Sequence, residues 1–292
     1  GVLDFTNRTS GNAPGGAFAM RVNGDVSQTG GRIKSTKGFD AQNLFVLSGT
    51  AMQNILLSNI TDTITLVVSN SAGASLQGPL ALPYKLLLQN GYLQLNQHNA
   101  TVQAGRVAQA AVSPTPAVVT NGNGKLVVAN VTGAQNFPVA PFYPGYNPVT
   151  VTNTGVANTY SARVSYGIQP GDNIDPLKAV YRTWNISSSA PVANQTTALS
   201  FQYSDTDKVA GATVLPDAAM LLAHFTSRWG YDPLIPAIPT AVSGRYSVGP
   251  FSPASLDSSF AIGNAGYVSG TYIFTGTGNW SIPANWDNGL VP

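Results

Sequence analysis

The first third of the chain alternates short apolar runs with clusters of turn-forming residues. Gly, Asn, Ser and Pro fill the intervals, and successive runs follow one another at a spacing of about ten residues. The apolar runs occupy residues 44–47, 55–57, 65–68, 84–88 and 93–95. Intervals this short leave almost no room for helices, so the pattern predicts short strands joined by turns.

Two arrangements fit this spacing: an antiparallel meander, and a parallel β-helix in which every turn contributes two or three strands. Asn90-Gly91 lies between two apolar runs and has the sequence of a tight hairpin turn, which favours antiparallel pairing at that point. The uncharged Asn, Thr and Ser turns favour the β-helix, because such side chains can form ladders along its axis. A β-helix-like module is what we expect for residues 1–112.

Composition supports an all-β fold. Charged residues make up 9% of the 292 residues, and the acidic residues are all Asp. Glu and Lys usually occupy exposed helix faces, but Glu is absent and Lys is scarce, whereas Thr and Val are abundant.

The same composition excludes several classes of partner and site. No cluster of Lys or Arg could follow a phosphate backbone, so we expect no nucleic-acid partner. Long uncharged stretches are broken by polar residues or Pro, so we expect no membrane span. Cysteine is absent, which excludes disulfides and thiolate metal sites.

The distribution of turn residues changes between residues 104 and 124. Ser113-Pro114-Thr115-Pro116 and Asn121-Gly122-Asn123-Gly124 interrupt the chain there, and we place a domain boundary near residue 112. From 113 to 268, apolar and polar residues alternate over longer runs, which predicts a β-sandwich. Residues 218–228 have a helix-forming composition, but we expect a strand there because the surrounding segments are all predicted as β.

Residues 269–292 form the third predicted region, a C-terminal strand tail. Residues 271–274 read TYIF, a short β-forming run with no hairpin partner after it. Neither end of the chain has a closing element, so we expect a segment of a longer polypeptide. An open solenoid end exposes unpaired backbone groups and an apolar interior. We therefore expect the tail of one unit to dock on the N-terminal module of the next, giving open head-to-tail assemblies.

Several segments resemble motifs of one group of bacterial proteins. The first module contains GDVSQTGG at 24–31, FVLSGTAMQ at 45–53, NSAGASLQGPL at 70–80 and LLLQNGYLQL at 86–95. The later part contains FPVAPFYPGYNPVTV at 137–151, RTWNIS at 182–187, AHFTSRW at 223–229, FSPASLDSSFAIG at 251–263 and NWSIPANWDNGLVP at 279–292. Together they resemble the repeat-rich secreted surface proteins of Bacteroidetes-type bacteria, which are substrates of type IX secretion, over nearly the whole chain.

The resemblance implies an extracellular protein at the bacterial cell surface, with β-helix-like repeats and a role as adhesin, filament or matrix component. The C-terminal sorting domain of that group does not occur in this sequence, in keeping with the expectation of a segment. In those bacteria an Asp-Ser/Thr-aliphatic pattern marks O-glycosylation, so the resemblance implies Thr63 in Asp62-Thr63-Ile64 as a candidate acceptor.

The sequence offers few groups for catalysis or metal binding. His98 and His224 lie in different modules, and no nucleophile elbow, phosphate-binding loop or dinucleotide motif occurs. The close carboxylate pairs are Asp172/Asp175 and Asp205/Asp207, which could contribute calcium ligands or simply form turns. We expect no enzyme activity and no cofactor, and calcium at these two loops stays open.

Aromatic residues are the remaining candidates. For binding or assembly we single out four in the tail: Tyr272, Phe274, Trp280 and Trp286. Trp184 lies in an alternating strand, and we expect it in the core. Tyr143, Tyr146 and Phe142 accompany a Pro-rich loop and, like the tryptophans, could form a sugar platform.

These features predict a non-catalytic structural segment of an extracellular bacterial surface fibre or adhesin. Its expected partners are further copies of the chain or neighbouring repeats of the same protein. The alternative is a carbohydrate-binding module of a secreted hydrolase, for which surface glycans would be the partner.

Overall fold

The computed structural model describes residues 2–4, 18–35, 43–170, 173–191, 196–214, 218–231, 236–253, 255–264, 268, 278–282 and 285. The protein is nearly all β, with 56% strand and 2% helix, which confirms the predicted class. It separates into two compact units, Gly1–Arg163 and Val164–Pro292, and the division falls inside strand β15 (Val149–Tyr166).

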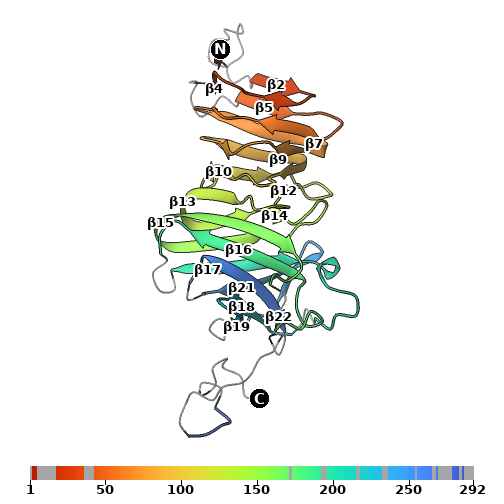
Figure 1. Cartoon of the computed structure of the whole chain (residues 1–292), viewed down its shortest axis with the longest axis vertical. Coiled ribbons are helices and arrows are strands. Elements are labelled where there is room, and N and C mark those ends of the chain that lie inside the picture. Colours follow the sequence, from red (N-terminus) through yellow and green to blue (C-terminus); the bar gives the residue numbers. More distant parts are fainter. Residues whose placement is uncertain are drawn as a thin grey trace. The chain divides into compact units, whose positions relative to one another are not determined.

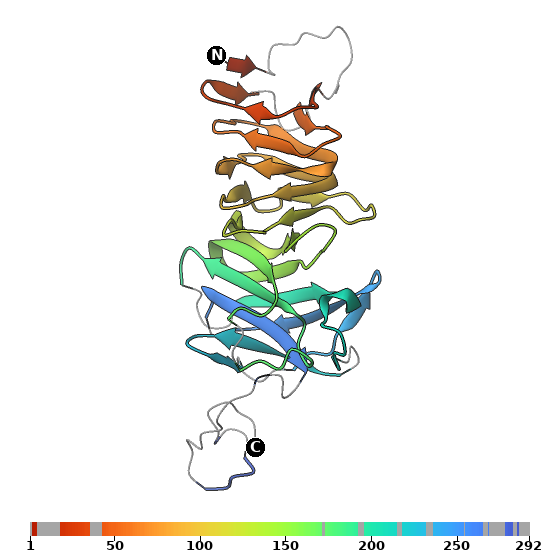
Figure 2. The same ribbon diagram turned by 45° about the vertical axis from the view of Figure 1, so that its right-hand side comes forward.

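The first unit is a parallel β-solenoid of about five turns. Its strands lie one above another in layers, as Figure 1 and Figure 2 both show. Before β15 they are β1 (Val2–Asp4), β2 (Phe18–Val22), β3 (Val26–Ser27), β4 (Arg32–Lys34), β5 (Asn43–Leu47), β6 (Gln53–Leu56), β7 (Ile64–Leu76), β8 (Leu80–Ala81), β9 (Lys85–Gln94), β10 (Ala100–Gln103), β11 (Val107–Gln109), β12 (Ala117–Val119), β13 (Leu126–Phe137) and β14 (Val139–Ala140).

The turns repeat after about 20 residues, and this period places like residues in columns. In the sheet ordered β14-β12-β9-β7-β5-β2, Phe45 pairs with Leu66, and Leu66 pairs with Leu86. All three side chains are at most 2% exposed. Since alternate residues of a strand point to opposite faces, one apolar residue in two is enough to fill the interior. Burying each such side chain favours folding by roughly 1.5–3 kcal/mol relative to leaving it in water.

Buried amide side chains hold the corners of the solenoid. The Gln53 side chain donates to the carbonyl oxygens of Val22 and Gly24 at 3.0 and 2.6 Å. It also accepts from the Asn70 side-chain amide at 3.0 Å, and Asn70 donates in addition to the Ala51 carbonyl at 2.7 Å. Uncharged polar side chains therefore link one turn to the next, as expected for a β-helix.

The hairpin predicted at Asn90-Gly91 is wrong, and so is the meander. Strand β9 continues through these residues and pairs in parallel with β7, with shifts of register at this point. Gly91 has a φ of 83°, and a Cβ atom there would lie 1.8 Å from the Asn70 carbonyl oxygen of the preceding turn. The glycine is thus needed for the close approach of two stacked turns rather than for a reversal of the chain.

The solenoid also continues past residue 112, where the sequence suggested a boundary. Strand β12 pairs in parallel with β9, and β13 pairs in parallel with β10. Antiparallel pairing begins only where β15 returns along β13, with Leu126 opposite Ala162. The two compact units are divided at Arg163/Val164. The Pro and Gly residues near 112 lie between strands of the solenoid and do not form a linker.

The second unit is built of antiparallel strands. After the end of β15, its elements are β16 (Arg182–Ser188), β17 (Thr197–Tyr203), the short 3₁₀ helix η1 (Asp205–Asp207), β18 (Met220–Phe225), β19 (Trp229–Tyr231), β20 (Thr240–Val242), β21 (Arg245–Phe251) and β22 (Ser258–Asn264). Their order is β19-β18-β22-β16, and β21 lies between β17 and β20. The strand β18 confirms the expectation for residues 218–228.

Aromatic side chains form much of the interior of the second unit. Trp184 is fully buried, as expected, and its ring centroid lies 5.0 Å from that of Phe201. Trp229 is also buried, and its indole N–H donates to the Pro170 carbonyl at 2.7 Å. The unit also buries the ion pair of Arg182 and Asp207, with a nitrogen–oxygen distance of 2.7 Å, and Arg245 approaches the same carboxylate at 3.4 Å.

Candidate functional site: the open first turn of the solenoid

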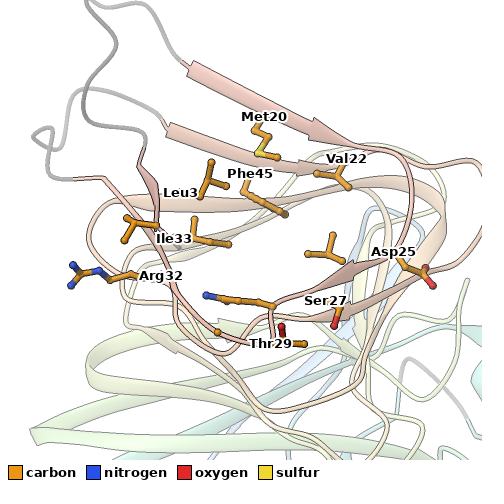
Figure 3. A pocket seen from close by; sticks show the side chains of 13 residues that line it. Leu3, Met20, Val22, Asp25, Ser27, Thr29, Arg32, Ile33 and Phe45 are labelled. Atoms are coloured by element: carbon orange, nitrogen blue, oxygen red, sulfur yellow. The ribbon is translucent and has the colours of Figure 1, made fainter.

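A cavity of about 550 Å³ lies at the first turn of the solenoid (Figure 3). Most of its wall is apolar, from Leu3, Met20, Val22, Val26, Ile33 and Phe45. Met20 pairs with Phe45 and Val22 with Leu47, so Met20 and Val22 continue two interior columns of the solenoid. Phe45 and Leu47 are buried, whereas Met20 and Val22 are only half-buried. The cavity is therefore the interior of the solenoid at its first described turn.

Strand β2 presents one edge of backbone groups at this cavity. The Val22 carbonyl accepts from the Ser48 N–H at 2.9 Å, so the backbone groups of Val22 face β5. Because these groups alternate in direction along a strand, those of Ala19 and Arg21 face the opposite side. Within the described part of the chain, β2 has no pairing strand on that side. Such an edge can accept a further strand.

Another strand of the same turn, β4, already carries a parallel partner. Strand β1 pairs in parallel with β4, with Val2 beside Arg32, Leu3 beside Ile33 and Asp4 beside Lys34. Leu3 contributes to the cavity wall and lies beside Ile33 in Figure 3. Ile33 is 7% exposed and Leu3 is 40% exposed. The first turn is therefore covered on one face by a parallel strand with an apolar residue at the inward position.

Polar side chains fix the rim of the cavity. Gln28 donates to the Asn59 carbonyl at 3.1 Å and accepts from the Ser58 N–H at 3.0 Å, which ties the first turn to the second. The Asp25 carboxylate accepts from the backbone and side-chain N–H groups of Asn54 at 2.8 and 3.2 Å. These hydrogen bonds stabilise the ionised form and lower the pKa of Asp25 below its ordinary value. In Figure 3, Asp25 and Arg32 direct their charged groups away from the apolar centre.

This arrangement suits the binding of an apolar, extended segment. It combines an apolar wall with one edge of backbone donors and acceptors, and both charged groups point outward. Among the described residues, no group of three or more His, Asp, Glu or Cys side chains is placed to hold a metal ion.

Of the four aromatic residues predicted for binding or assembly, the structure describes Trp280. Its side chain is 66% exposed. Tyr272, Phe274 and Trp286 lie outside the described residues. Thr63, the predicted glycosylation site, is half-buried, and its hydroxyl donates to the Ser35 carbonyl at 3.3 Å.

The carboxylates of the two close Asp pairs have partners within the protein where the structure describes them. Asp207 receives hydrogen bonds from Arg182 at 2.7 Å and from the Ser204 N–H at 2.7 Å, and Asp205 pairs with Lys208 at 2.7 Å. Asp175 accepts from the Leu177 N–H at 3.0 Å, whereas Asp172 lies outside the described residues. The described carboxylates therefore act in turns and ion pairs.

The aromatic residues of the Pro-rich loop pack onto the solenoid. Tyr143 stacks on Tyr92 with ring centroids 4.7 Å apart, and the Tyr146 hydroxyl donates to Gln109 at 2.9 Å. Both tyrosines cover small buried residues of β12 and β14. Phe142 is the exposed member of this group. The loop thus forms a small satellite core, with one ring directed to solvent.

Sequence reasoning did not single out the residues of the cavity. Phe18–Val22 shows the alternation of a strand, and Met20 and Val22 are its inward positions, but the register with β5 was needed to place them. The place of Leu3 in the cavity could not be predicted either, because its neighbour in space, Ile33, lies thirty positions away in the sequence.

Comparisons with known proteins identify no relative: no family model, no curated protein and no solved structure matches this chain. Nor do the described residues include a helix that is long and apolar enough to cross a membrane.

Proposed function

We propose that this chain is a non-catalytic structural segment of an extracellular bacterial surface fibre or adhesin, and that it assembles head to tail. The observation that carries the proposal is the parallel β-solenoid with an apolar cavity at its first described turn. A solenoid grows by adding identical layers, so its end is by construction a surface complementary to another strand layer. The extracellular location rests on the sequence motifs quoted above.

Head-to-tail contacts place different surfaces of two copies together, and they continue indefinitely unless the rotation closes a ring. In this proposal the predicted tail strand at 271–274 meets the first turn of the next copy. Tyr272, Phe274, Trp280 and Trp286 provide the aromatic contacts.

Sedimentation velocity over a range of concentrations tests the assembly. The intact chain is expected to form assemblies whose mass rises with concentration, and a variant lacking residues 270–292 is expected to stay monomeric. A deletion variant with the same assembly state as the intact chain would rule out this head-to-tail contact.

One observation favours the alternative, a carbohydrate-binding module of a secreted hydrolase: the indole of Trp280 is largely exposed. Exposed aromatic rings are suited to packing against apolar faces of ligands. Binding to a glycan array that Trp280→Ala abolishes would support this alternative. Turnover of any polysaccharide by the intact chain would contradict both functions.

A further inference from the structure

We infer that the outer face of the sheet formed by β8, β10, β13 and β15 binds a polysaccharide that carries acidic groups. This inference goes beyond the proposed head-to-tail assembly and does not depend on it. It starts from the distribution of charge: the first unit contains nine Lys or Arg residues but four Asp residues. Between Asp62 and Asp172 no acidic residue occurs. The Lys and Arg residues of that stretch are Lys85, Arg106, Lys125 and Arg163.

One pair of like charges lies at the start of β13. Leu126 pairs with Ala162 of the antiparallel strand β15, and in the same register Lys125 lies opposite Arg163. The Arg163 guanidinium is anchored to the solenoid, because it donates to the Gly122 carbonyl at 3.0 Å. Like charges at opposite strand positions repel each other. An anion beside Lys125 and Arg163 would relieve this repulsion.

The second pair lies beyond the other end of β10. Val107 pairs in parallel with Leu86, and the Leu86 N–H donates to the Arg106 carbonyl at 2.9 Å. Arg106 therefore lies beside Lys85 of the preceding turn. The Arg106 guanidinium lies over the Tyr84 ring, 4.6 Å from its centroid, and this contact favours one position of the charge.

The surface between the two pairs is uncharged and consists of short side chains. Lys125 is two positions before Val127, so both side chains lie on the same face of the sheet. Leu126, between them, is buried, which makes the face of Lys125 the outer one. The column that crosses β8, β10, β13 and β15 on this face consists of Ala81, Thr101, Val127 and Ser161.

This arrangement selects a polymer rather than a small anion. Strand β10 has four residues, so it separates the two pairs by roughly 13 Å, and one carboxylate or sulfate group cannot reach both. An acidic polysaccharide carries anionic groups at intervals along one chain. Its hydroxyl groups suit the hydroxyl side chains of Thr101 and Ser161 between the pairs.

Other macromolecules fit this face less well. The column between the pairs contains no aromatic side chain, and aromatic residues commonly anchor the centre of a protein–protein interface. A nucleic acid needs a continuous series of cations along its phosphate backbone, whereas the cations here are grouped at two separate places.

Isothermal titration calorimetry of the intact chain with polygalacturonate tests the inference. At low ionic strength we expect saturable binding that weakens as salt is added, because salt screens exposed charges. Neutral dextran should give no binding. The test variant Lys85→Gln/Lys125→Gln removes one cation from each pair and keeps the two arginines with their internal contacts. The matched control, Lys178→Gln/Arg228→Gln, removes the same charge from exposed positions of the second unit.

We expect Lys85→Gln/Lys125→Gln to weaken polygalacturonate binding about three- to tenfold, as the loss of two surface charge contacts implies. The control should bind as the natural chain does. Because the test variant removes repulsion between like charges, its thermal unfolding without ligand should not shift to lower temperature. This measurement distinguishes lost binding from lost folding.

Equal weakening in the two variants would overturn the inference, since binding would then depend on total charge alone. The absence of polygalacturonate binding at low ionic strength would also overturn it, as would tighter binding of single-stranded DNA. If Lys85→Gln/Lys125→Gln instead abolishes self-association and the intact chain does not bind polygalacturonate, this face contacts another copy, whose second unit contains eight Asp residues against five Lys or Arg. The deletion of residues 270–292 tests the proposed function separately.

Discussion

The two units of the molecule bury polar side chains in different ways. In the second unit, Arg182 and Asp207 are both buried and form an ion pair. In the first unit, the buried polar side chains of the described residues are all uncharged: Ser35, Asn43, Gln53, Thr65, Asn70, Ser75, Thr120, Gln135, Asn147 and Asn153. An amide side chain both donates and accepts hydrogen bonds, so it can link two neighbouring turns. The same kind of link can be repeated in each further turn. The buried carboxylate of Asp207 instead pairs with oppositely charged groups, Arg182 at 2.7 Å and Arg245 at 3.4 Å.

The apolar interiors of the two units also differ, in whether their contacts repeat from layer to layer. The solenoid stacks aliphatic side chains in columns, and each layer contacts mainly the layers beside it. The second unit packs Trp184, Phe201 and Phe251 against one another across strands that are far apart in sequence. We therefore expect stability to be distributed over similar layers in the first unit, and to depend on a few contacts in the second.

The largest expected effect is that of Asp207→Ala. It leaves the Arg182 guanidinium buried without its carboxylate, which should lower the free energy of unfolding of the second unit by about 3–5 kcal/mol. The buried Trp184 and Trp229 both lie in this unit, and no tryptophan precedes residue 184, so tryptophan fluorescence in urea reports its unfolding.

The matched control is Asp205→Ala, two positions earlier. The Asp205 side chain is 70% exposed and pairs with Lys208, so its loss should cost less than about 1 kcal/mol. If the two substitutions have equal effects, the buried ion pair is not the centre of stability in the second unit.

Leu66→Ala tests whether damage to the solenoid stays local. Removing this fully buried side chain should cost about 3 kcal/mol, because a cavity remains between Phe45 and Leu86. Hydrogen exchange should accelerate in β5, β7 and β9, while the tryptophan transition of the second unit stays unchanged. Leu87→Ala, at a half-buried position of the outer face, should have a smaller effect. A matching shift of the tryptophan transition would contradict the distinction between the two units.

Gly91→Ala tests how much the close approach of stacked turns contributes to stability. Its methyl group would meet the Asn70 carbonyl, whereas the same substitution at Gly105 meets only open space, although both glycines have positive φ. Both variants bear the backbone cost of about 1–2 kcal/mol, and Gly91→Ala should lose roughly a further 1–3 kcal/mol to overpacking. Thermal unfolding followed by circular dichroism measures the difference. Equal losses would mean that the turns can separate freely.

The smallest effect concerns the pH dependence of the solenoid rim. Two hydrogen bonds from Asn54 lower the pKa of Asp25 below the ordinary value of 3.8 in the folded protein. The ionised carboxylate therefore contributes stability above that ordinary value, and the contribution is lost as the pH falls through the lower, folded-state pKa. An NMR titration should give Asp25 a depressed pKa that Asn54→Ala returns towards 3.8. An unchanged pKa in Asn54→Ala would show that these hydrogen bonds do not set it.

Much of the fold could be predicted because the local signals agree with one another. The short apolar runs of the first third became β5, β6, β7 and β9, and the absence of Glu together with abundant Thr and Val matched an all-β chain. The strand at Met220–Phe225 was also predicted, against its local helix-forming composition, from the β character of its surroundings.

The sequence by itself determined that the chain forms short strands separated by turns, since apolar runs and turn residues depend only on neighbouring residues. It did not determine that Asn90-Gly91 continues a strand, nor that the solenoid passes residue 112. Both depend on which turn lies beside which, as when Gly91 admits the Asn70 carbonyl of the turn before it. The open first turn is likewise a product of the tertiary structure. Met20, Val22 and Ile33 line one cavity only because the register of β2 with β5, and of β1 with β4, brings them together.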